Sequence, residues 1–276
     1  MGDRRGSDGG APADAGRRRP RLRRCSGALA VVGLAVVLGG CNAPTYFAFR
    51  GATTQGRDEF KLWVLMVSLG LAVAIFVWAL IFWSIIVYRR RSDVIPRQFH
   101  EHIPLEITYT VIPFIMVLGI FWATVLTENN VDAVAPHPAI TVNVSAFQWG
   151  WQFTYKGKHV TIVTSEAAAL AILPQDPTDS AYPQLYLPLG ETVQINLASN
   201  DVAHSMWVPA FNFSRMALPG YLNQFDFTPT QTGTFAGRCN QYCGLYHSEM
   251  LFNVHVVSDS AFQAWLTAHQ SPGGGS

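Results

Sequence analysis

The sequence predicts an all-β sandwich preceded by an α-helical hairpin of two transmembrane segments. Two long stretches, residues 62–88 and 105–127, are almost entirely apolar. Residues 139–257 instead alternate short β-rich runs with Pro, Gly and Asn. The chain has 276 residues, of which 49% are apolar, so it has room for both parts and is not a disordered protein.

Residues 1–40 resemble an export signal of the bacterial lipoprotein type. The basic stretch RRRPRLRR (17–24) precedes SGALAVVGLAVVL (26–38), an apolar run too short to span a bilayer comfortably. Small residues in LGGC then lead to Cys41, as in a lipobox. This resemblance implies that Cys41 is lipidated and becomes the first residue of the mature protein. A plain signal peptide with an incidental cysteine is the alternative.

Residues 41–61 are expected to form a short external segment ahead of two membrane-spanning helices. Residues 62–88 contain no charged side chain, and residues 105–127 contain only Glu106. Both segments exceed the roughly 20 residues that a spanning helix needs. The loop between them, residues 89–104, carries four Arg against two acidic residues, so the positive-inside rule places it in the cytoplasm. Everything after the second helix then lies outside.

The external part, residues 128–270, is expected to be one β-sandwich. The runs ITVNVSAFQWGWQFTY, TVQINLA, TGTFAGRC and MLFNVHVV alternate apolar and polar residues, which is typical of strands with one buried face. Residues 164–188 are expected to be a loop, 258–270 a short helix with Ser and Asp caps, and 271–276 a flexible tail.

The charge of the external part limits its partners. Residues 128–276 carry four basic against ten acidic side chains, a net charge near −6. This balance argues against nucleic acid, whose phosphates need cationic partners. An acidic surface is suited to a basic protein partner instead.

The segment GRCNQYCGLYHSEM places two cysteines, a histidine and a methionine close together. In an oxidising compartment, a disulfide between Cys239 and Cys243 is the simplest explanation. His247 and Met250 favour a metal site, because thiolate, imidazole and thioether groups suit copper far better than calcium or magnesium. A mononuclear blue-copper site uses one cysteine, so the second cysteine suggests two copper ions that share both thiolates.

Such a site needs one more imidazole, and His204 in DVAHSMWVP can supply it from the end of a predicted strand. The pattern C-x-x-x-C-G-x-x-H-x-x-M, preceded by D-V-x-H-S, resembles the dinuclear copper A site of subunit II of haem–copper oxidases. LEITYTVIP, FQWGWQFTY and ALPGYLNQF resemble further segments of cytochrome c oxidase subunit II, so the resemblance covers roughly residues 60–257. It implies a cupredoxin-like Greek-key sandwich behind a two-helix transmembrane hairpin.

The resemblance also implies a set of copper ligands. Two cysteines would bridge the copper ions, each of two histidines would bind one ion, and a methionine and a backbone carbonyl would be weaker ligands. These residues are Cys239, Cys243, His204, His247, Met250 and Gln241, the last through its carbonyl oxygen.

Two further residues gain roles from the resemblance. Trp149 matches the family's tryptophan at the point of electron entry, whereas Trp151 is expected to fill the core, as large aromatics usually do. Glu106 matches the glutamate at the mouth of a proton channel into subunit I. Alternatively, Glu106 lies at the cytoplasmic interface and simply reaches into water.

The implied function is that of a respiratory cytochrome c oxidase subunit. It would accept electrons from cytochrome c, or from a membrane-bound haem-c donor, and relay them to the haems of subunit I. There oxygen is reduced to water, coupled to proton translocation. The implied partners are subunits I and III, the electron donor and membrane lipid, in a bacterial cell membrane with the C-terminal domain outside.

The sequence departs from the family at its magnesium site. Gln241 stands where the family commonly has a magnesium-binding Glu, and Ser214, Arg215 and Met216 replace a Lys-x-Asp pattern. An amide binds magnesium more weakly than a carboxylate, so we expect weak magnesium binding or none.

Two other functions compete with an oxidase subunit of this kind. Subunit II of a quinol oxidase shares the fold and topology but lacks the copper ligands, which are all present here. An exported lipoprotein that carries copper would need neither two spanning helices nor Glu106.

Overall fold

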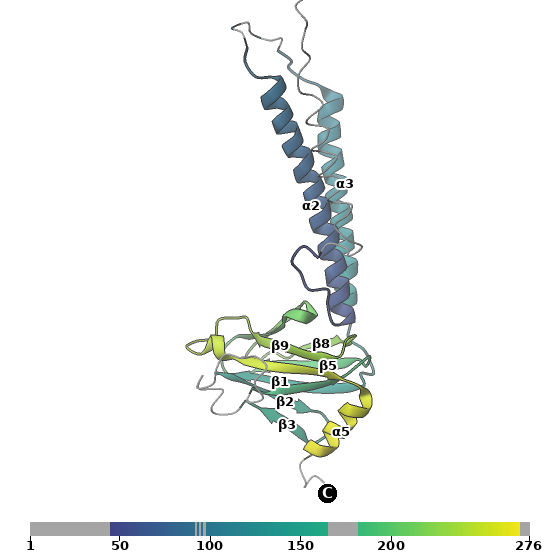
Figure 1. Ribbon diagram of the computed structural model, residues 1–276, viewed down its shortest axis with the longest axis vertical. Helices are drawn as coiled ribbons and strands as arrows, with labels where there is room; N and C mark the ends of the chain where they lie inside the picture. The colour runs from purple at the N-terminus through teal and green to yellow at the C-terminus, as the bar shows by residue number, and fades with distance from the viewer. Residues whose placement is uncertain (1–44, 92, 94, 96–97, 165–181, 271–276) are drawn as a thin grey trace, which may run out of the picture. The chain divides into compact units, whose positions relative to one another are not determined.

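The computed structural model describes residues 45–91, 93, 95, 98–164 and 182–270. The predicted signal segment 1–40, the lipidation site Cys41 and the tail 271–276 lie outside the described residues. The described elements are two long helices, two five-stranded sheets and a C-terminal helix (Figure 1).

The two helices are α2 (Thr54–Val87) and α3 (Ile103–Val131), and each is long and apolar enough to cross a membrane. Each begins at a side-chain cap, because the first amides of a helix have no partner within it. The oxygen of Thr53 accepts a hydrogen bond from the amide of Gly56 at 3.0 Å, and Nδ1 of His102 accepts one from Leu105 at 3.2 Å. Helix α2 begins before the predicted apolar span 62–88, and α3 ends after the predicted span 105–127.

The strands form two mixed sheets. The first has the order β3-β2-β1-β5-β8 and the second β4-β10-β9-β6-β7. Most neighbours are antiparallel, but β1 pairs with β5, and β4 with β10, in parallel. In chain order the strands are β1 (Ile140–Phe147), β2 (Gly150–Tyr155), β3 (Val160–Val163), β4 (Gln184–Pro188), β5 (Val193–Ser199), β6 (His204–Val208), β7 (Phe213–Ala217), β8 (Asn223–Phe227), β9 (Gly233–Cys239) and β10 (Leu251–Val257).

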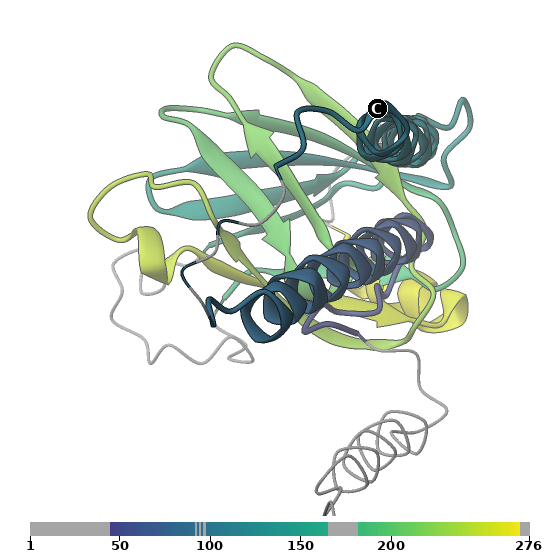
Figure 2. The same ribbon diagram turned by 90° about the horizontal axis from the view of Figure 1, so that it is seen from above.

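Short helical elements complete the fold. Two 3-10 turns, η1 (Pro209–Phe211) and η2 (His247–Glu249), follow β6 and precede β10. Helix α5 (Asp259–His269) begins at the predicted Ser258 cap and packs against β4. Figure 2 shows the strands from above, with α5 beside them. The predicted terminal helix is therefore confirmed.

Two local expectations were wrong. Strand β4 lies inside the stretch that we expected to be a loop. Its parallel partner β10 is more than sixty residues away in the sequence, so no local pattern predicts this strand. His204 begins β6 and does not end a strand. The four β-rich runs singled out in the sequence do contain β1, β2, β5, β9 and β10.

The core lies between the inner faces of the two sheets. Inward residues alternate along the strands, as in β1, because successive side chains of a strand point to opposite faces. Trp151 is fully buried and packs edge-to-face on Phe252, with ring centroids 5.3 Å apart. Its predicted role as a core residue is confirmed.

The segment just before α2 also belongs to this core. Ala52 and Thr53 are buried, and the amide of Ala52 donates to the carbonyl of Ala210 at 2.8 Å. The amide of Thr230 donates to the carbonyl of Ala52 at 2.8 Å. Gly56 comes so close to η1 that a Cβ there would lie 1.9 Å from the carbonyl oxygen of Phe211, so only glycine fits. The start of α2 is thus fastened to the sandwich.

Candidate metal centre

The predicted ligands meet at one end of the second sheet. Cys239 ends β9, Met250 precedes β10, and the amide of Cys239 donates to the carbonyl of Met250 at 3.0 Å, which closes the loop between them. Strand β6 is the other neighbour of β9, with Met206 opposite Cys239, and this pairing brings His204 to the same end. Three adjacent strands therefore hold the site in place.

The two cysteines are both buried and form no disulfide. Their sulfur atoms lie 3.9 Å apart, nearly twice the S–S bond length of about 2.05 Å. A thiolate–metal bond is about 2.3 Å in zinc sites, so one metal ion can contact both sulfurs at this separation. The disulfide alternative is not what the structure contains, and the spacing suits bridging thiolates.

The two histidines approach different sulfur atoms. Nδ1 of His204 lies 3.9 Å from Sγ of Cys239, and Nδ1 of His247 lies 3.5 Å from Sγ of Cys243. The ligand atoms of His204 and both cysteines all lie within 4.8 Å of one another, and His247 is not in that group.

The two weaker predicted ligands are also in place. Sδ of Met250, a buried residue, lies 3.8 Å from Sγ of Cys243. The thiol of Cys239 donates to the carbonyl oxygen of Gln241 at 3.2 Å. The four other predicted ligand atoms therefore lie around the two cysteine sulfurs, and this soft donor set fits copper.

The electrostatics of the cysteines favour a bound cation. Burial raises the pKa of Cys243 to about 12, and negative charge on Cys239 adds to the rise. Burial also acts on Cys239, but hydrogen bonds with His204 and with backbone groups outweigh it and hold the pKa of Cys239 below its ordinary value. Two thiolates this close repel each other, so a metal ion is what would keep both ionised.

Asp201 contacts one of the predicted ligands, and the sequence alone did not single it out. Its Oδ1 lies 2.8 Å from Nε2 of the buried His204, on the far side of the ring from Cys239. Asp201 also accepts hydrogen bonds from the amides of Gln148 at 2.6 Å and Val202 at 2.7 Å. Such carboxylate partners fix the tautomer and orientation of metal-binding histidines. The signal was the Asp three residues before His204 in DVAH.

Trp149 contacts the ligand loop directly. Its indole N–H donates to the carbonyl of Cys243 at 3.2 Å, and the side-chain amide of Gln148 donates to the same oxygen at 2.7 Å. The ring of Tyr246 packs edge-on against Trp149, with centroids 4.9 Å apart. Gly244 has a φ of 121°, and a Cβ there would lie 3.1 Å from Trp149, so glycine permits this contact.

Glu106 lies far from this loop in the sequence, in the first turn of α3. Its Oε1 accepts a hydrogen bond from the amide of His102 at 3.1 Å, and the side chain is exposed. Glu106 therefore helps to cap the helix, a structural role that the sequence analysis did not consider.

The residues at the family's magnesium positions are neutral or paired. The hydroxyl of Ser214 exchanges hydrogen bonds with Asn240 and lies 3.0 Å from the hydroxyl of Ser205. Arg215 forms an ion pair with Asp132. Gln241 is exposed.

Known proteins that match this chain include subunits of the same type of oxidase that the sequence resembles. The family model for the periplasmic domain of cytochrome c oxidase subunit II matches residues 140–257. The chain is 35% identical to the probable cytochrome c oxidase subunit 2 of Streptomyces avermitilis, over 92% of this chain and 89% of the relative. It is 31% identical to cytochrome c oxidase subunit 2 of Mycobacterium tuberculosis, over 89% of this chain and 81% of the relative. Among solved structures, the periplasmic domain of subunit II of cytochrome oxidase from Bradyrhizobium japonicum matches with a TM-score of 0.43 and 23% identity, over 49% of this chain and 96% of that one.

Proposed function

Because the chain belongs to the cytochrome c oxidase subunit II family, we propose that it accepts electrons at a dinuclear copper A centre and relays them to subunit I of a haem–copper oxidase. The observation that carries this proposal is the convergence of two imidazoles, a thioether and a carbonyl around two thiol sulfurs 3.9 Å apart. A quinol oxidase subunit would have no use for this donor set.

In this proposal, the thiolates of Cys239 and Cys243 and the imidazoles of His204 and His247 would hold the two copper ions. Met250 and the carbonyl of Gln241 complete the coordination. When bound, the copper pair takes up and gives back one electron. Strands β6, β9 and β10 hold these donor groups in place, and a site held in this way would need little reorganisation when an electron is transferred.

Trp149 is our proposed point of electron entry from cytochrome c or a membrane-bound haem-c donor. Its hydrogen bond to the carbonyl of Cys243 gives a short path from a partly exposed ring to a bridging ligand. The acidic balance of the external part suits a basic donor.

We further propose that Glu106 lies at the cytoplasmic mouth of a proton path into subunit I, where oxygen is reduced to water with proton translocation. The basic loop before α3 supports the cytoplasmic placement of this end. Subunit III and membrane lipid are the other expected partners. The proposed location is a bacterial cell membrane, with the copper domain outside and lipid on Cys41.

Magnesium at the interface with subunit I is not part of this proposal. Gln241 offers only an amide, and Ser214, Arg215 and Met216 add no carboxylate. Replacing Gln241 with Glu should increase the magnesium or manganese retained by the assembled complex and leave the copper spectrum nearly unchanged.

The copper proposal can be tested by electron paramagnetic resonance of the full-length chain after copper loading. We expect the signal of one unpaired electron shared by two copper nuclei. Cys239→Ser and Cys243→Ser should each abolish it, because a serine oxygen is a poor ligand for this soft metal. Ser248→Ala, in the same loop, is the control and should keep it. A stable Cys239–Cys243 disulfide in protein from copper-replete membranes would contradict the proposal.

A further inference from the structure

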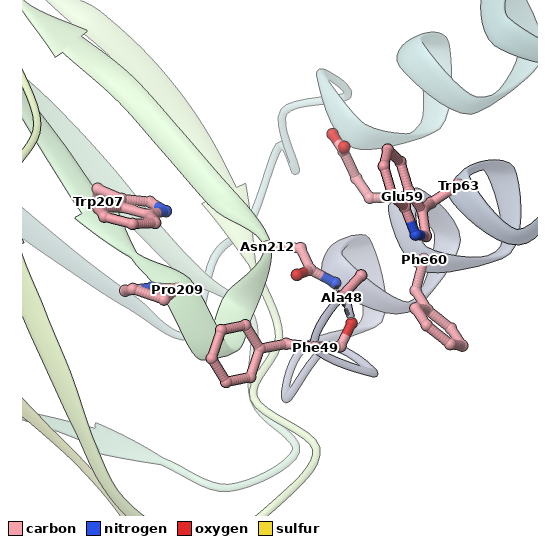
Figure 3. A pocket seen from close by; sticks show the side chains of 8 residues that line it. All are labelled: Ala48, Phe49, Glu59, Phe60, Trp63, Trp207, Pro209 and Asn212. Atoms are coloured by element: carbon pink, nitrogen blue, oxygen red, sulfur yellow. Dashed lines mark hydrogen bonds between the residues drawn. The ribbon is translucent and has the colours of Figure 1, made fainter. Parts of the chain in front are cut away.

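A cavity of about 290 Å³ lies between the beginning of α2 and the segment β6–η1. Figure 3 shows Glu59 and Trp63 of α2 on one side, with Trp207 and Pro209 across the gap. Four aromatic rings contribute to the lining, those of Phe49, Phe60, Trp63 and Trp207. None of the predicted copper ligands lines it, so this cavity is separate from the metal centre.

The cavity contains both hydrogen-bond acceptors and hydrogen-bond donors. Among the lining residues only Glu59 is charged, and within the described chain it forms no hydrogen bond or ion pair. The amide nitrogen of Asn212 is used, since it donates to the carbonyls of Phe49 at 2.7 Å and Gly56 at 3.1 Å. Among the described residues no hydrogen bond is made to its oxygen, so the cavity offers a carboxylate and an amide oxygen as acceptors. The indole N–H groups of Trp63 and Trp207 are its donors.

The electrostatic surroundings favour a positively charged occupant. The charged groups that act on Glu59 are Arg215, Asp132 and Glu128. Asp132 and Glu128 add negative charge near Glu59, and the one guanidinium among these groups is already paired with Asp132. Aromatic faces also attract cations, organic ammonium groups above all. An ammonium group brings only donors, which matches the two acceptors.

The position of the cavity points to a lipid. Trp63 lies at the start of the long apolar stretch of α2, at the level where interfacial aromatics meet lipid headgroups. Phe49 and Trp63 are 56% and 44% exposed, so the aromatic wall continues into the apolar surface of the helix. We propose that the cavity binds the headgroup of a zwitterionic phospholipid of the phosphatidylethanolamine type. Its ammonium contacts Glu59 and Asn212, and its phosphate accepts from the indole N–H groups.

The test uses the whole oxidase complex in nanodiscs that contain equal amounts of dioleoyl phosphatidylethanolamine and dioleoyl phosphatidylglycerol. After transfer to detergent, native mass spectrometry counts the lipids that stay bound. Glu59→Gln should lose one phosphatidylethanolamine per complex and keep its phosphatidylglycerol. Asp58→Asn is the matched control, because its carboxylate pairs with Lys61 outside the cavity, and it should lose neither lipid.

A second variant, Trp63→Leu, should lose the same lipid because it removes a ring and an indole donor. The copper spectrum, recorded on the same samples, shows that each variant is folded and separates this test from that of the copper centre. Equal phosphatidylethanolamine retention in wild type, Glu59→Gln and Trp63→Leu would overturn the proposal. Loss of phosphatidylglycerol instead, or a Lys or Arg of another subunit seated in the cavity of the assembled complex, would overturn it as well.

Discussion

The carboxylate of Asp201 and the imidazole of His204 form a pair in which Asp201 Oδ1 lies 2.8 Å from His204 Nε2, which leaves Nδ1 facing the sulfur of Cys239. His204 is fully buried, so this contact fixes both the tautomer and the direction of the ring. Asp201 is itself held by the amides of Gln148 and Val202, and Gln148 also contacts the ligand loop. The orientation of His204, a proposed ligand, thus depends on a turn outside that loop.

Asp201→Asn should weaken copper binding without abolishing it. The amide keeps the shape of the side chain but can no longer hold the ring as a charged acceptor. Loss of such an outer partner typically lowers metal affinity by about 10–100-fold. Titration of the full-length chain against a competing copper chelator measures this change. Asp259→Asn, at the start of α5, is the control and should leave the affinity unchanged. An unchanged copper affinity in Asp201→Asn would show that the imidazole of His204 does not need Asp201 to hold its orientation.

Met250→Leu should retain copper and shift its reduction potential, because a thioether is a weak ligand that tunes the site. Met250 is buried, and leucine has a similar volume, so the fold should tolerate the change. Redox titration followed by optical absorption measures the potential. Met206→Leu changes a buried methionine of β6 that is not a proposed ligand and should leave the potential in place. Loss of the copper from Met250→Leu would mean that this thioether is a principal ligand.

Trp149→Phe should slow electron entry severely while the copper spectrum stays intact. Phenylalanine fills part of the same space but cannot donate to the carbonyl of Cys243. Stopped-flow reduction by the electron donor measures the rate, and the donor's apparent affinity should fall as salt rises if its charge is opposite. Tyr155→Phe, a buried position away from the loop, is the comparison. An unchanged rate would leave Trp149 as a packing residue.

Glu106 can be examined with two substitutions that separate its roles. Glu106→Gln keeps an oxygen that can accept from the amide of His102 but cannot exchange a proton, whereas Glu106→Ala removes both functions. If Glu106 collects protons, both variants should lower steady-state turnover and slow reduction of the haem–copper site, with electron entry unaffected. If Glu106→Gln keeps full turnover and only Glu106→Ala loses turnover, the role of Glu106 is to cap the helix and not to carry protons.

His255 should make the external domain less stable in acid. Burial lowers the pKa of His255, so the folded state binds its proton less readily than the unfolded state, whose pKa is about 6.5. The contribution of His255 to stability should be constant above that value and should fall as pH drops below it. Thermal unfolding of the full-length chain between about pH 5 and 8 measures this. His255→Gln should flatten the profile, and exposed His137→Gln should not.

The cluster of proposed copper ligands could be found in the sequence because five of the six residues lie within one short segment with distinctive chemistry. His204 was found from the pattern around it, although its place at the start of β6 depends on pairing with β7 and β9. Asp201 stands in the sequence close to His204, but its contact with the imidazole depends on the turn before β6. Strand β4 was missed because its partner is distant in sequence. Local pattern therefore identified the chemistry, and long-range pairing decided the supporting contacts.

Residues 52 and 53 precede both long helices, yet they are buried in a sandwich whose strands all follow those helices. The sandwich can complete its core only when the chain before α2 and the chain after α3 are on the same side of the membrane. Two crossings satisfy this condition, and one crossing would leave Thr230 and Ala210 without their partners at Ala52. The domain therefore completes its interior only when both ends of the helical hairpin lie on its side. A fragment that starts after α3 would lack part of its own interior.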